Sequence, residues 1–383
     1  GNKPFVFFEG PPSANGLPGV HHVLARAIKD IFPRYKTMKG FQVKRKAGWD
    51  THGLPIELGV EKELGITKED IGKTITVEEY NAACRKAVMR YTDIWNDLTQ
   101  KMGYWVNMDD PYITYEPKYM ESVWWLLKQI YEKNLMYKGY TIQPYSPKAG
   151  TGLSSHELNQ PGTYQDVTDT TVVAQFKAIK DTLPDFLQNE GDIYFLAWTT
   201  TPWTLPSNTA LTVGAKIDYV LVDTFNQYTF EPTKVILAKN LVGKQFGGKK
   251  NIQVEDVDKL NEYNSGEKKI PFYVVKEFKG KDLLEIRYDQ LLDYVLPHNN
   301  PQDAFRVIAG DFVTTEDGTG IVHTSPTFGA DDALVAKQAS PEIPPMLIKD
   351  ENDNLVPLVD LQGKFVKELG EFGGKYVKNE YYK

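Results

Sequence analysis

Hydrophobic and polar positions near the start of the chain alternate between short apolar runs and a helical repeat. The run KPFVFFEG at 3–10 is β-branched and aromatic and ends at glycine and two prolines, so it predicts a buried strand followed by a tight turn. A helix is predicted to begin near Val20, and Pro33 should stop or bend it. Its apolar residues recur at intervals of three and four and predict one face packed on a core: Val23, Leu24, Ala27, Ile28 and Ile31. The run FQVKRKAGWD at 41–50 predicts the next strand, and this order of elements is typical of a doubly wound α/β fold.

Two more helical patterns follow. A long helix is predicted over 78–102 and a second one over about 116–133. We expect the apolar stripe of each to face a core. The stripes consist of Cys84, Ala87, Tyr91, Ile94, Trp95, Leu98 and Met102 in the first helix, and of Tyr119, Val123, Trp124, Leu127 and Ile130 in the second.

After residue 140 the pattern changes to short β-rich runs separated by Gly, Pro, Asn and Asp. The runs are TTVVAQFKA, DIYFLAWTT, TALTVG, YVLVD, KVILA and PFYVV. They predict a second, mainly β domain that begins near 165. The stretch 240–270, with its lysine pairs and scattered Gly and Asn, is expected to be an exposed excursion within that domain.

Composition narrows the class of protein. The chain has 383 residues, of which 41% are hydrophobic and 12% aromatic, which predicts a multi-domain globular protein. No apolar run approaches the ~18 to 20 residues of a membrane span, and one cysteine, Cys84, fits a reducing, cytoplasmic location. The net charge of −7 gives no general attraction to polyanions, so a nucleic acid would need local basic patches. One such cluster consists of Arg34, Lys36, Lys39, Lys44, Arg45 and Lys46.

The stretch GPPSANGLPGVHHVLARAIKD, residues 10–30, places two histidines at the mouth of a predicted helix. A helix start after Gly and Pro presents free N–H groups and the positive end of the helix dipole, which suits phosphate binding. A capped helix with surface histidines is the ordinary alternative. Neither a Walker lysine loop nor GxGxxG is present, so the residues alone leave both interpretations open.

The segment PPSANGLPGVHHVLARAIKD resembles the first signature of class I aminoacyl-tRNA synthetases, and KAGWDTHGLPIE resembles the next segment of isoleucyl-tRNA synthetases. YMESVWWLLKQIYEKNLMYKGYTIQPYSP, WTTTPWTLPSNTALTV and DGTGIVHTSPTFGADD are also similar to isoleucyl enzymes, in the same order. The resemblance implies the amino-terminal part of such an enzyme. Its fold would be α/β: the first half of a Rossmann-like catalytic domain over 1–140, a connecting stem over 141–165 and an inserted, mainly β-barrel editing (CP1) domain over 166–383.

For activation, the resemblance implies that ATP, with Mg²⁺, and isoleucine bind in the first domain. The amino acid would lie against Gly10 and Pro11, and Asp50 would bind its ammonium group and orient its carboxylate toward the α-phosphate. Taken without the resemblance, Asp50 is a plain turn residue. The implied ATP-binding residues are Gly10, Pro11, Pro12, Asn15, Gly16, Gly19 and His22, with His21 and His22 as catalytic residues.

The signature departs from the family pattern. The usual order is His, any residue, Gly, His, whereas Gly19, Val20, His21 and His22 occupy these positions here. Losing one hydrogen bond to phosphate would cost roughly 1.5 to 3 kcal/mol, or about ten to a hundred-fold in rate. Either His21 takes over the role of the absent histidine, which we favour because the flanking segments are kept, or the nucleotide is excluded. The family's lysine-serine loop does not occur in these residues, so we expect this chain alone not to charge tRNA(Ile).

The resemblance also implies hydrolytic editing of valine-charged tRNA(Ile). A pocket discriminates against one missing methylene by only ~1 to 3 kcal/mol, and isoleucyl-tRNA synthetase against valine is the standard example of this limit. The hydroxyls of Thr199, Thr200 and Thr201 would orient water and hold the terminal ribose. The other implied editing residues are Asn208, His323, which would line the side-chain pocket, and Asp332, which would bind the ammonium group. Strand-end threonines, a structural histidine and a helix-capping aspartate are the ordinary alternatives.

Other candidates are weaker. Ser154, Ser155, His156 and Glu157 lack both the G-x-S-x-G elbow and the HExxH spacing, and we assign them to the stem. Ser146 and Ala149 stand where many bacterial relatives have a zinc-binding cysteine pair, so no zinc and no other metal site are expected. We expect a monomer without a membrane partner. The alternatives are a non-activating tRNA-binding or editing-only paralogue and, more remotely, a small-molecule adenylyltransferase, against which the threonine-rich segment argues.

Overall fold

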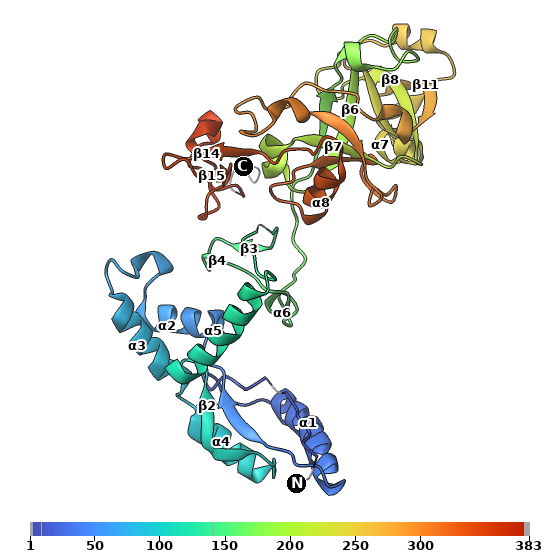
Figure 1. Ribbon diagram of the computed structural model, residues 1–383. Helices are drawn as coiled ribbons and strands as arrows, with labels where there is room; N and C mark the ends of the chain where they lie inside the picture. The colour runs from blue at the N-terminus through green and yellow to red at the C-terminus, as the bar shows by residue number, and fades with distance from the viewer. Residues whose placement is uncertain (1–2, 9, 140, 379–383) are drawn as a thin grey trace. The chain divides into compact units, whose positions relative to one another are not determined.

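The computed structural model describes residues 3–8, 10–139 and 141–378 and divides the chain into two compact units, residues 1–139 and 140–383. The domain boundary expected at 140 and the end expected at 383 lie outside the described residues. Figure 1 shows that helices predominate in the first unit and strands in the second. In the described part of the chain, no helix combines the length and the apolar character that a membrane crossing needs.

The first unit is built from helices around a short parallel strand pair (Figure 1). The helices are α1 (Val20–Met38), α2 (Leu54–Leu64), α3 (Val77–Val88), α4 (Thr92–Lys101) and α5 (Pro117–Glu132), with a 3₁₀ turn η1 (Lys68–Asp70). The strands are β1 (Lys46–Trp49) and β2 (Asn107–Ile113). The predicted start of α1 and the extent of α5 are confirmed, and the strand predicted over 41–50 is present in shorter form as β1.

The buried strand predicted over 3–10 is wrong. Pro4 forms a single parallel bridge to Gln42, and Phe8 is 90% exposed. Among the described residues of this segment, backbone hydrogen bonds are made to Gln42: Phe5 N–H donates to Gln42 O, and Gln42 N–H donates to Lys3 O, each at 3.0 Å. The side chains of Phe7 and Phe8 line a cavity together with Lys44, Arg45 and Lys46.

The long helix predicted over 78–102 is also wrong, because the chain breaks between α3 and α4. Tyr91 N–H donates to the carbonyl of Ala14, 3.1 Å away, rather than continuing the helix. Trp95 in α4 then packs with Ala14 and Trp49 in a small core. Pro33 does not stop α1, which continues to Met38, since a proline removes only one helical hydrogen bond and α1 keeps the others.

The apolar stripes of α1 and α5 do not face a core, contrary to the prediction. Leu24 is 61% exposed and Trp124 is 64% exposed. The side chains that α1 buries are instead Arg26, Asp30 and Pro33. A two-stranded sheet offers too little surface to cover both helices, so within the described residues these stripes face solvent. In α4 the prediction is confirmed for Trp95, which is 1% exposed, and is wrong for Ile94, which is 45% exposed.

The second unit contains, within the described residues, a nine-stranded mixed sheet. Its order is β10, β11, β8, β9, β6, β13, β7 and β12, and β5 also pairs with β6. The strands are β5 (Val172–Lys177), β6 (Ile193–Thr199), β7 (Ala210–Val213), β8 (Asp218–Phe225), β9 (Pro232–Ala238), β10 (Asn251–Gln253), β11 (Ile270–Lys279), β12 (Arg306–Ala309) and β13 (Ile321–Thr324). Each of the six predicted β-rich runs contains a strand, so the α/β class with a mainly β second part is confirmed.

Smaller elements complete the second unit. In residues 141–378, short hairpins are formed by β3 (Tyr145–Ser146) with β4 (Thr151–Gly152) and by β14 (Leu347–Lys349) with β15 (Leu355–Pro357). The α-helices are α6 (Ser155–Leu158), α7 (Val242–Phe246) and α8 (Ala330–Gln338). The 3₁₀ helices are η2 (Lys180–Thr182), η3 (Pro202–Ser207), η4 (Lys239–Leu241), η5 (Val257–Glu262), η6 (Gly280–Leu283), η7 (Pro301–Asp303) and η8 (Lys367–Phe372).

The sheet brings two distant segments together at one edge. Strand β13 runs parallel to β6, with Val322 opposite Trp198, and antiparallel to β7. Because parallel strands end at the same edge, the residues after β6 and the residues after β13 emerge side by side. The threonines that follow β6 and the helix α8 that follows β13 therefore belong to the same edge.

Candidate functional site

A line of hydroxyl groups follows β6. Thr199 is buried at the strand end, and its Oγ1 accepts a hydrogen bond from Thr201 N–H at 3.1 Å. Thr204 lies in η3 and donates from Oγ1 to Thr201 O at 2.8 Å. Thr200 and Thr201 are exposed, and no hydrogen bond of the Thr200 side chain occurs in the described structure. The loop thus presents exposed hydroxyls on a buried, hydrogen-bonded base.

His323 joins this loop to the sheet. Its Nε2 lies 2.9 Å from Thr204 Oγ1, and its Nδ1 lies 2.8 Å from Nδ2 of Asn208. The residue is only 6% exposed, and this burial lowers the pKa of His323 to about 4. The imidazole is therefore neutral at physiological pH, with both nitrogens already bonded. It is suited to hold the loop in place and poorly suited to exchange protons.

Asn208 is equally enclosed. Its Nδ2 donates to Ala210 O at 2.8 Å, and its Oδ1 accepts from the hydroxyl of Tyr288 at 2.7 Å. The structure thus joins Asn208 and His323 to residues 199–204, which we call the threonine loop. Thr204 and Tyr288 belong to the same hydrogen-bonded group, and the sequence analysis missed both. Thr204 could have been found from its spacing of three after Thr201. Tyr288 lies 80 residues from Asn208, and no local pattern marks it.

Asp332 occupies the first turn of α8. Its Oδ2 accepts a hydrogen bond from Ser325 N–H at 2.8 Å, just beyond the end of β13. Burial raises the pKa of Asp332 to about 6, against the lowering effect of the Ser325 N–H, and the charge of Asp331 raises it slightly further. A Cβ at Gly329 would come within 2.6 Å of the Asp332 carboxylate, so glycine is what lets the carboxylate fold back over the turn.

The two parts of the predicted editing site share an edge without direct bonds. In the described structure, no hydrogen bond joins Asp332 to Thr199, Thr200 or Thr201. Ser325 lies between them in the chain, and its Oγ is buried without a partner. The edge therefore offers exposed hydroxyls, a neutral histidine and a desolvated carboxylate, which together suit a ligand that has a cationic group next to a polar, cleavable one.

In the first unit, the two histidines sit at the start of α1 as predicted. Gly19 N–H donates to Nδ1 of His22 at 2.9 Å, and the His22 ring packs edge-on against Trp95 at 4.8 Å. The ring of His21 is exposed and lies 3.8 Å from that of His22. Burial, followed by the nearby charges of His21 and Arg26, lowers the pKa of His22. His22 is thus neutral, and its Nε2 is the ring nitrogen left for a ligand.

The two signature segments are adjacent. Asp50 N–H donates to Pro12 O at 2.9 Å, and the Asp50 side chain is exposed. The turn before α1 is held by α4, because Trp95 Nε1 donates to Gly16 O at 2.9 Å. Asn15 follows the fully buried Ala14, whereas Gly10 is exposed. The predicted residues therefore lie along one ordered stretch.

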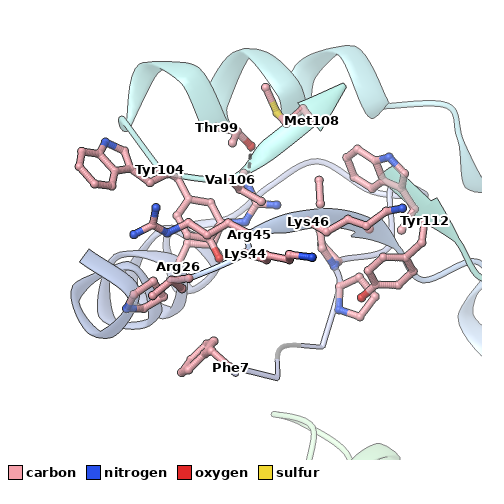
Figure 2. Close-up of a pocket in the computed structure, with 18 of the residues that line it drawn as sticks. Phe7, Arg26, Lys44, Arg45, Lys46, Thr99, Tyr104, Val106, Met108 and Tyr112 are labelled. Atoms are coloured by element: carbon pink, nitrogen blue, oxygen red, sulfur yellow. Dashed lines mark hydrogen bonds between the residues drawn. The ribbon is translucent and has the colours of Figure 1, made fainter. Parts of the chain in front are cut away.

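A cavity of about 260 Å³ opens in the first unit, and Figure 2 shows Arg26, Lys44, Arg45 and Lys46 around it. Arg26 donates to Thr99 at 2.7 Å, and Lys46 pairs with Asp110 at 2.8 Å. Of the predicted ATP-binding residues, only Pro11 and Pro12 line this cavity. The cavity therefore overlaps the predicted ATP-binding residues at these two prolines alone, and contact of the basic cluster with tRNA stays a prediction.

Comparison with known proteins gives consistent matches. Residues 1–316 match the family described as tRNA synthetases class I (I, L, M and V). The chain is 64% identical over 381 residues to the isoleucine–tRNA ligase of Cytophaga hutchinsonii, covering 100% of this chain and 33% of that protein. It is 62% identical over 393 residues to the isoleucine–tRNA ligase of Bacteroides fragilis, covering 98% of this chain and 33% of that protein. The chain thus spans about a third of the length of these curated relatives.

Among solved structures, the chain is similar to part of a leucyl-tRNA synthetase. The editing domain of the cytosolic leucyl-tRNA synthetase of P. knowlesi aligns with a TM-score of 0.32 and 13% identity. That alignment covers 45% of this chain and 63% of the other chain.

Proposed function

We propose, given that this chain belongs to the class I tRNA synthetases (I, L, M and V), that it is part of an isoleucine–tRNA ligase that also hydrolyses valine-charged tRNA(Ile). In this proposal residues 1–140 form the first half of the activating domain, 141–165 the stem and 166–383 the editing domain. The similarity to isoleucine–tRNA ligases extends over the first unit as well as the second, so a non-activating paralogue is not favoured.

The observation that carries the editing proposal is the environment of the Asp332 carboxylate. Its carboxylate is largely desolvated, and no lysine or arginine pairs with it in the described structure. A partly buried carboxylate whose charge is not offset is destabilising unless a cation binds beside it. The ammonium group of an aminoacyl ester has the charge and size to fill that role, and binding it would place the ester near the threonine loop.

The chemistry that this edge supports is hydrolysis of an ester. A water molecule attacks the carbonyl carbon, the bond to the ribose oxygen breaks, and the ribose oxygen takes up a proton, which releases free valine and uncharged tRNA. The hydroxyls of Thr200 and Thr201 and the backbone around Thr199 would orient the water and the ribose. His323 is neutral and fully bonded, so in this proposal it and Asn208 position the loop rather than transfer protons.

Deacylation by the 383-residue chain tests this proposal. We expect the chain to release valine from valine-charged tRNA(Ile) and to leave isoleucine-charged tRNA(Ile) intact, and we expect Asp332→Ala to abolish the release. Asp331→Ala is the matched control, because Asp331 is the exposed neighbour in the same helical turn. Unchanged hydrolysis by Asp332→Ala would refute the assignment.

For activation, we propose that ATP with Mg²⁺ and isoleucine bind along the ordered stretch of the first unit. The ATP contacts would come from Gly10, Pro11, Pro12, Asn15, Gly16, Gly19 and His22, and Asp50 would bind the amino group. The hydrogen bond between Asp50 and Pro12 supports this assignment, because it places the two segments side by side. His21, exposed beside His22, is positioned to replace the histidine that the signature lacks.

Pyrophosphate exchange with isoleucine tests the activating role in the full-length protein. We expect measurable exchange with the natural Gly19 and His21. A variant with Gly19→His and His21→Gly restores the usual signature, and it also removes the His21 ring that a Cβ at position 19 would meet at 2.8 Å. Absence of exchange in the unaltered protein, together with exchange in this variant, would show that the nucleotide is excluded.

A further inference from the structure

Tyr288 is a buried tyrosine to which the proposed chemistry gives no role. It is 1% exposed, and its ring packs edge-on against Phe176 at 5.4 Å. Its hydroxyl reaches past this packing and donates to Asn208 Oδ1 at 2.7 Å. Asn208 is 2% exposed, so water has little access to that oxygen, and the Tyr288 hydroxyl is the donor that satisfies it in the described structure.

The hydroxyl of Tyr288 fixes which way the Asn208 amide faces. Because Oδ1 accepts from Tyr288, the amino group is turned to the other side, where it donates to Ala210 O at 2.8 Å. Its second hydrogen points to Nδ1 of His323, also 2.8 Å away. An amide nitrogen only donates, so Nδ1 of His323 must be the acceptor.

This arrangement fixes the hydrogen on the imidazole. A neutral ring with a bare Nδ1 carries its hydrogen on Nε2, which then donates to Thr204 Oγ1 at 2.9 Å. Thr204 accepts this hydrogen bond, and its own hydroxyl donates the next one to Thr201 O at 2.8 Å. A chain of hydrogen bonds, each with its donor on the core side, thus runs from the core to the exposed loop. Its five residues are Tyr288, Asn208, His323, Thr204 and Thr201.

We propose that Tyr288 is a positioning residue of the editing site, whose hydroxyl orients the Asn208 amide and thereby sets the tautomer of His323 and the placement of the Thr201 loop. This inference rests on the proposed editing function. Tyr288 touches no reacting group. Without its hydroxyl, Asn208 Oδ1 is left buried with no donor, and the energetic preference for the observed amide orientation falls.

A rotated Asn208 amide would turn Oδ1 toward His323. The ring would then carry its hydrogen on Nδ1, and Nε2 would no longer donate to Thr204. Rotation also gives up the hydrogen bond to Ala210 O, so neither orientation is fully satisfied. We therefore expect a Tyr288→Phe variant to populate both tautomers of His323.

The test compares two buried tyrosines. Tyr288→Phe keeps the ring and removes only the hydroxyl. The matched control is Tyr219→Phe, since Tyr219 is 0% exposed and its hydroxyl bonds only to the backbone of Gly214 and Gly320 in the described structure. Both variants lose a buried hydroxyl, but only one of these hydroxyls contacts Asn208.

The readouts are ring nitrogen signals and deacylation. The chain has six histidines, so ¹H–¹⁵N spectra of histidine-labelled protein resolve His323 once His323→Gln identifies its signals. We expect a hydrogen on Nε2 in the unaltered chain and in Tyr219→Phe, and mixed tautomers in Tyr288→Phe. For valine-charged tRNA(Ile), we expect kcat of Tyr288→Phe to fall about tenfold with KM little changed, and Tyr219→Phe to match the unaltered chain.

Two results would overturn the inference. One is a His323 spectrum that is the same in the unaltered chain and in Tyr288→Phe. The other is a changed spectrum with deacylation equal to that of Tyr219→Phe. If the unaltered chain releases no valine, the proposed function fails, and the tautomer comparison by itself decides whether Tyr288 orients Asn208 and His323.

Discussion

The backbone N–H of Gly19 donates a hydrogen bond to Nδ1 of His22, with 2.9 Å between the two nitrogens. His22 therefore closes the first turn of α1 with its own side chain, in the way that a polar side chain in the first turn reaches back to the N-cap. This use of Nδ1 leaves Nε2 as the nitrogen that a phosphate could meet. The structural role of His22 can be separated from any catalytic one.

We predict that His22→Ala frees the Gly19 amide. Without the Nδ1 acceptor that N–H is unpaired, and losing a cap of this kind costs about 0.5 to 2 kcal/mol. Hydrogen exchange of the Gly19 amide should therefore speed up. His21→Ala is the control, because the exposed His21 ring accepts no such bond in the described structure, and equal exchange in both variants would contradict the capping role.

The same bond predicts a pH dependence of the helix start. The pKa of His22 is lowered in the folded chain, so its contribution to stability is complete above the ordinary histidine pKa and is lost as the pH falls through the lowered value. Protection of the Gly19 amide should decline over that interval, once the intrinsic pH dependence of exchange is removed. Protection that stays constant down to pH 4 would contradict this prediction.

Gly329 is predicted to be required for the shape of the Asp332 site. An added Cβ would approach the Asp332 carboxylate within 2.6 Å, so Gly329→Ala should push the carboxylate from its place over the Ser325 N–H. We expect a loss of editing of about tenfold or more, at a modest cost in stability. Gly243→Ala in α7 is the control, since nothing lies within 4 Å of its added Cβ. Equal editing by the two variants would count against the site.

Asp332 is predicted to reduce stability at neutral pH. Its pKa is raised from 3.8 to about 6, so its favourable contribution is complete below pH 3.8 and is lost as the pH rises through about 6. Asp332→Asn keeps an oxygen for Ser325 N–H and removes the partly buried charge. The free energy of unfolding at pH 8 should therefore rise by about 2 to 3 kcal/mol, with little change below pH 4. An equal effect of the substitution at both pH values in urea unfolding would contradict the raised pKa.

Much of the local structure could be predicted from the sequence. Helix α5 follows from its apolar repeat of three and four, and the strands β5, β6 and β8 follow from β-rich runs bounded by turn residues. The break between α3 and α4 could not be predicted, because it depends on the carbonyl of Ala14, which is distant in the chain. The exposure of the apolar stripes of α1 and α5 could not be predicted either. Periodicity shows which face of a helix is apolar, but it does not show whether another element covers that face.

The candidate sites also depend on contacts between residues that are distant in the chain. Thr199 to Thr201 and Asp332 were singled out through a family resemblance, and their residue types alone are common at strand ends and helix starts. The pairing of β13 with β6 explains why they share an edge, and that pairing joins residues more than a hundred positions apart. Tyr288 was missed because only the folded sheet brings its hydroxyl to Asn208.

The central claim is that Asp332 and the threonine loop bind the esterified end of valine-charged tRNA together. The most direct measurement is a crystal structure of this chain with an analogue of the valine-charged 3′ adenosine in which an amide replaces the ester. We predict the valine ammonium within about 3 Å of the Asp332 carboxylate, with the amide beside Thr199 to Thr201. An analogue bound elsewhere, or bound here with its ammonium turned away from Asp332, would contradict it.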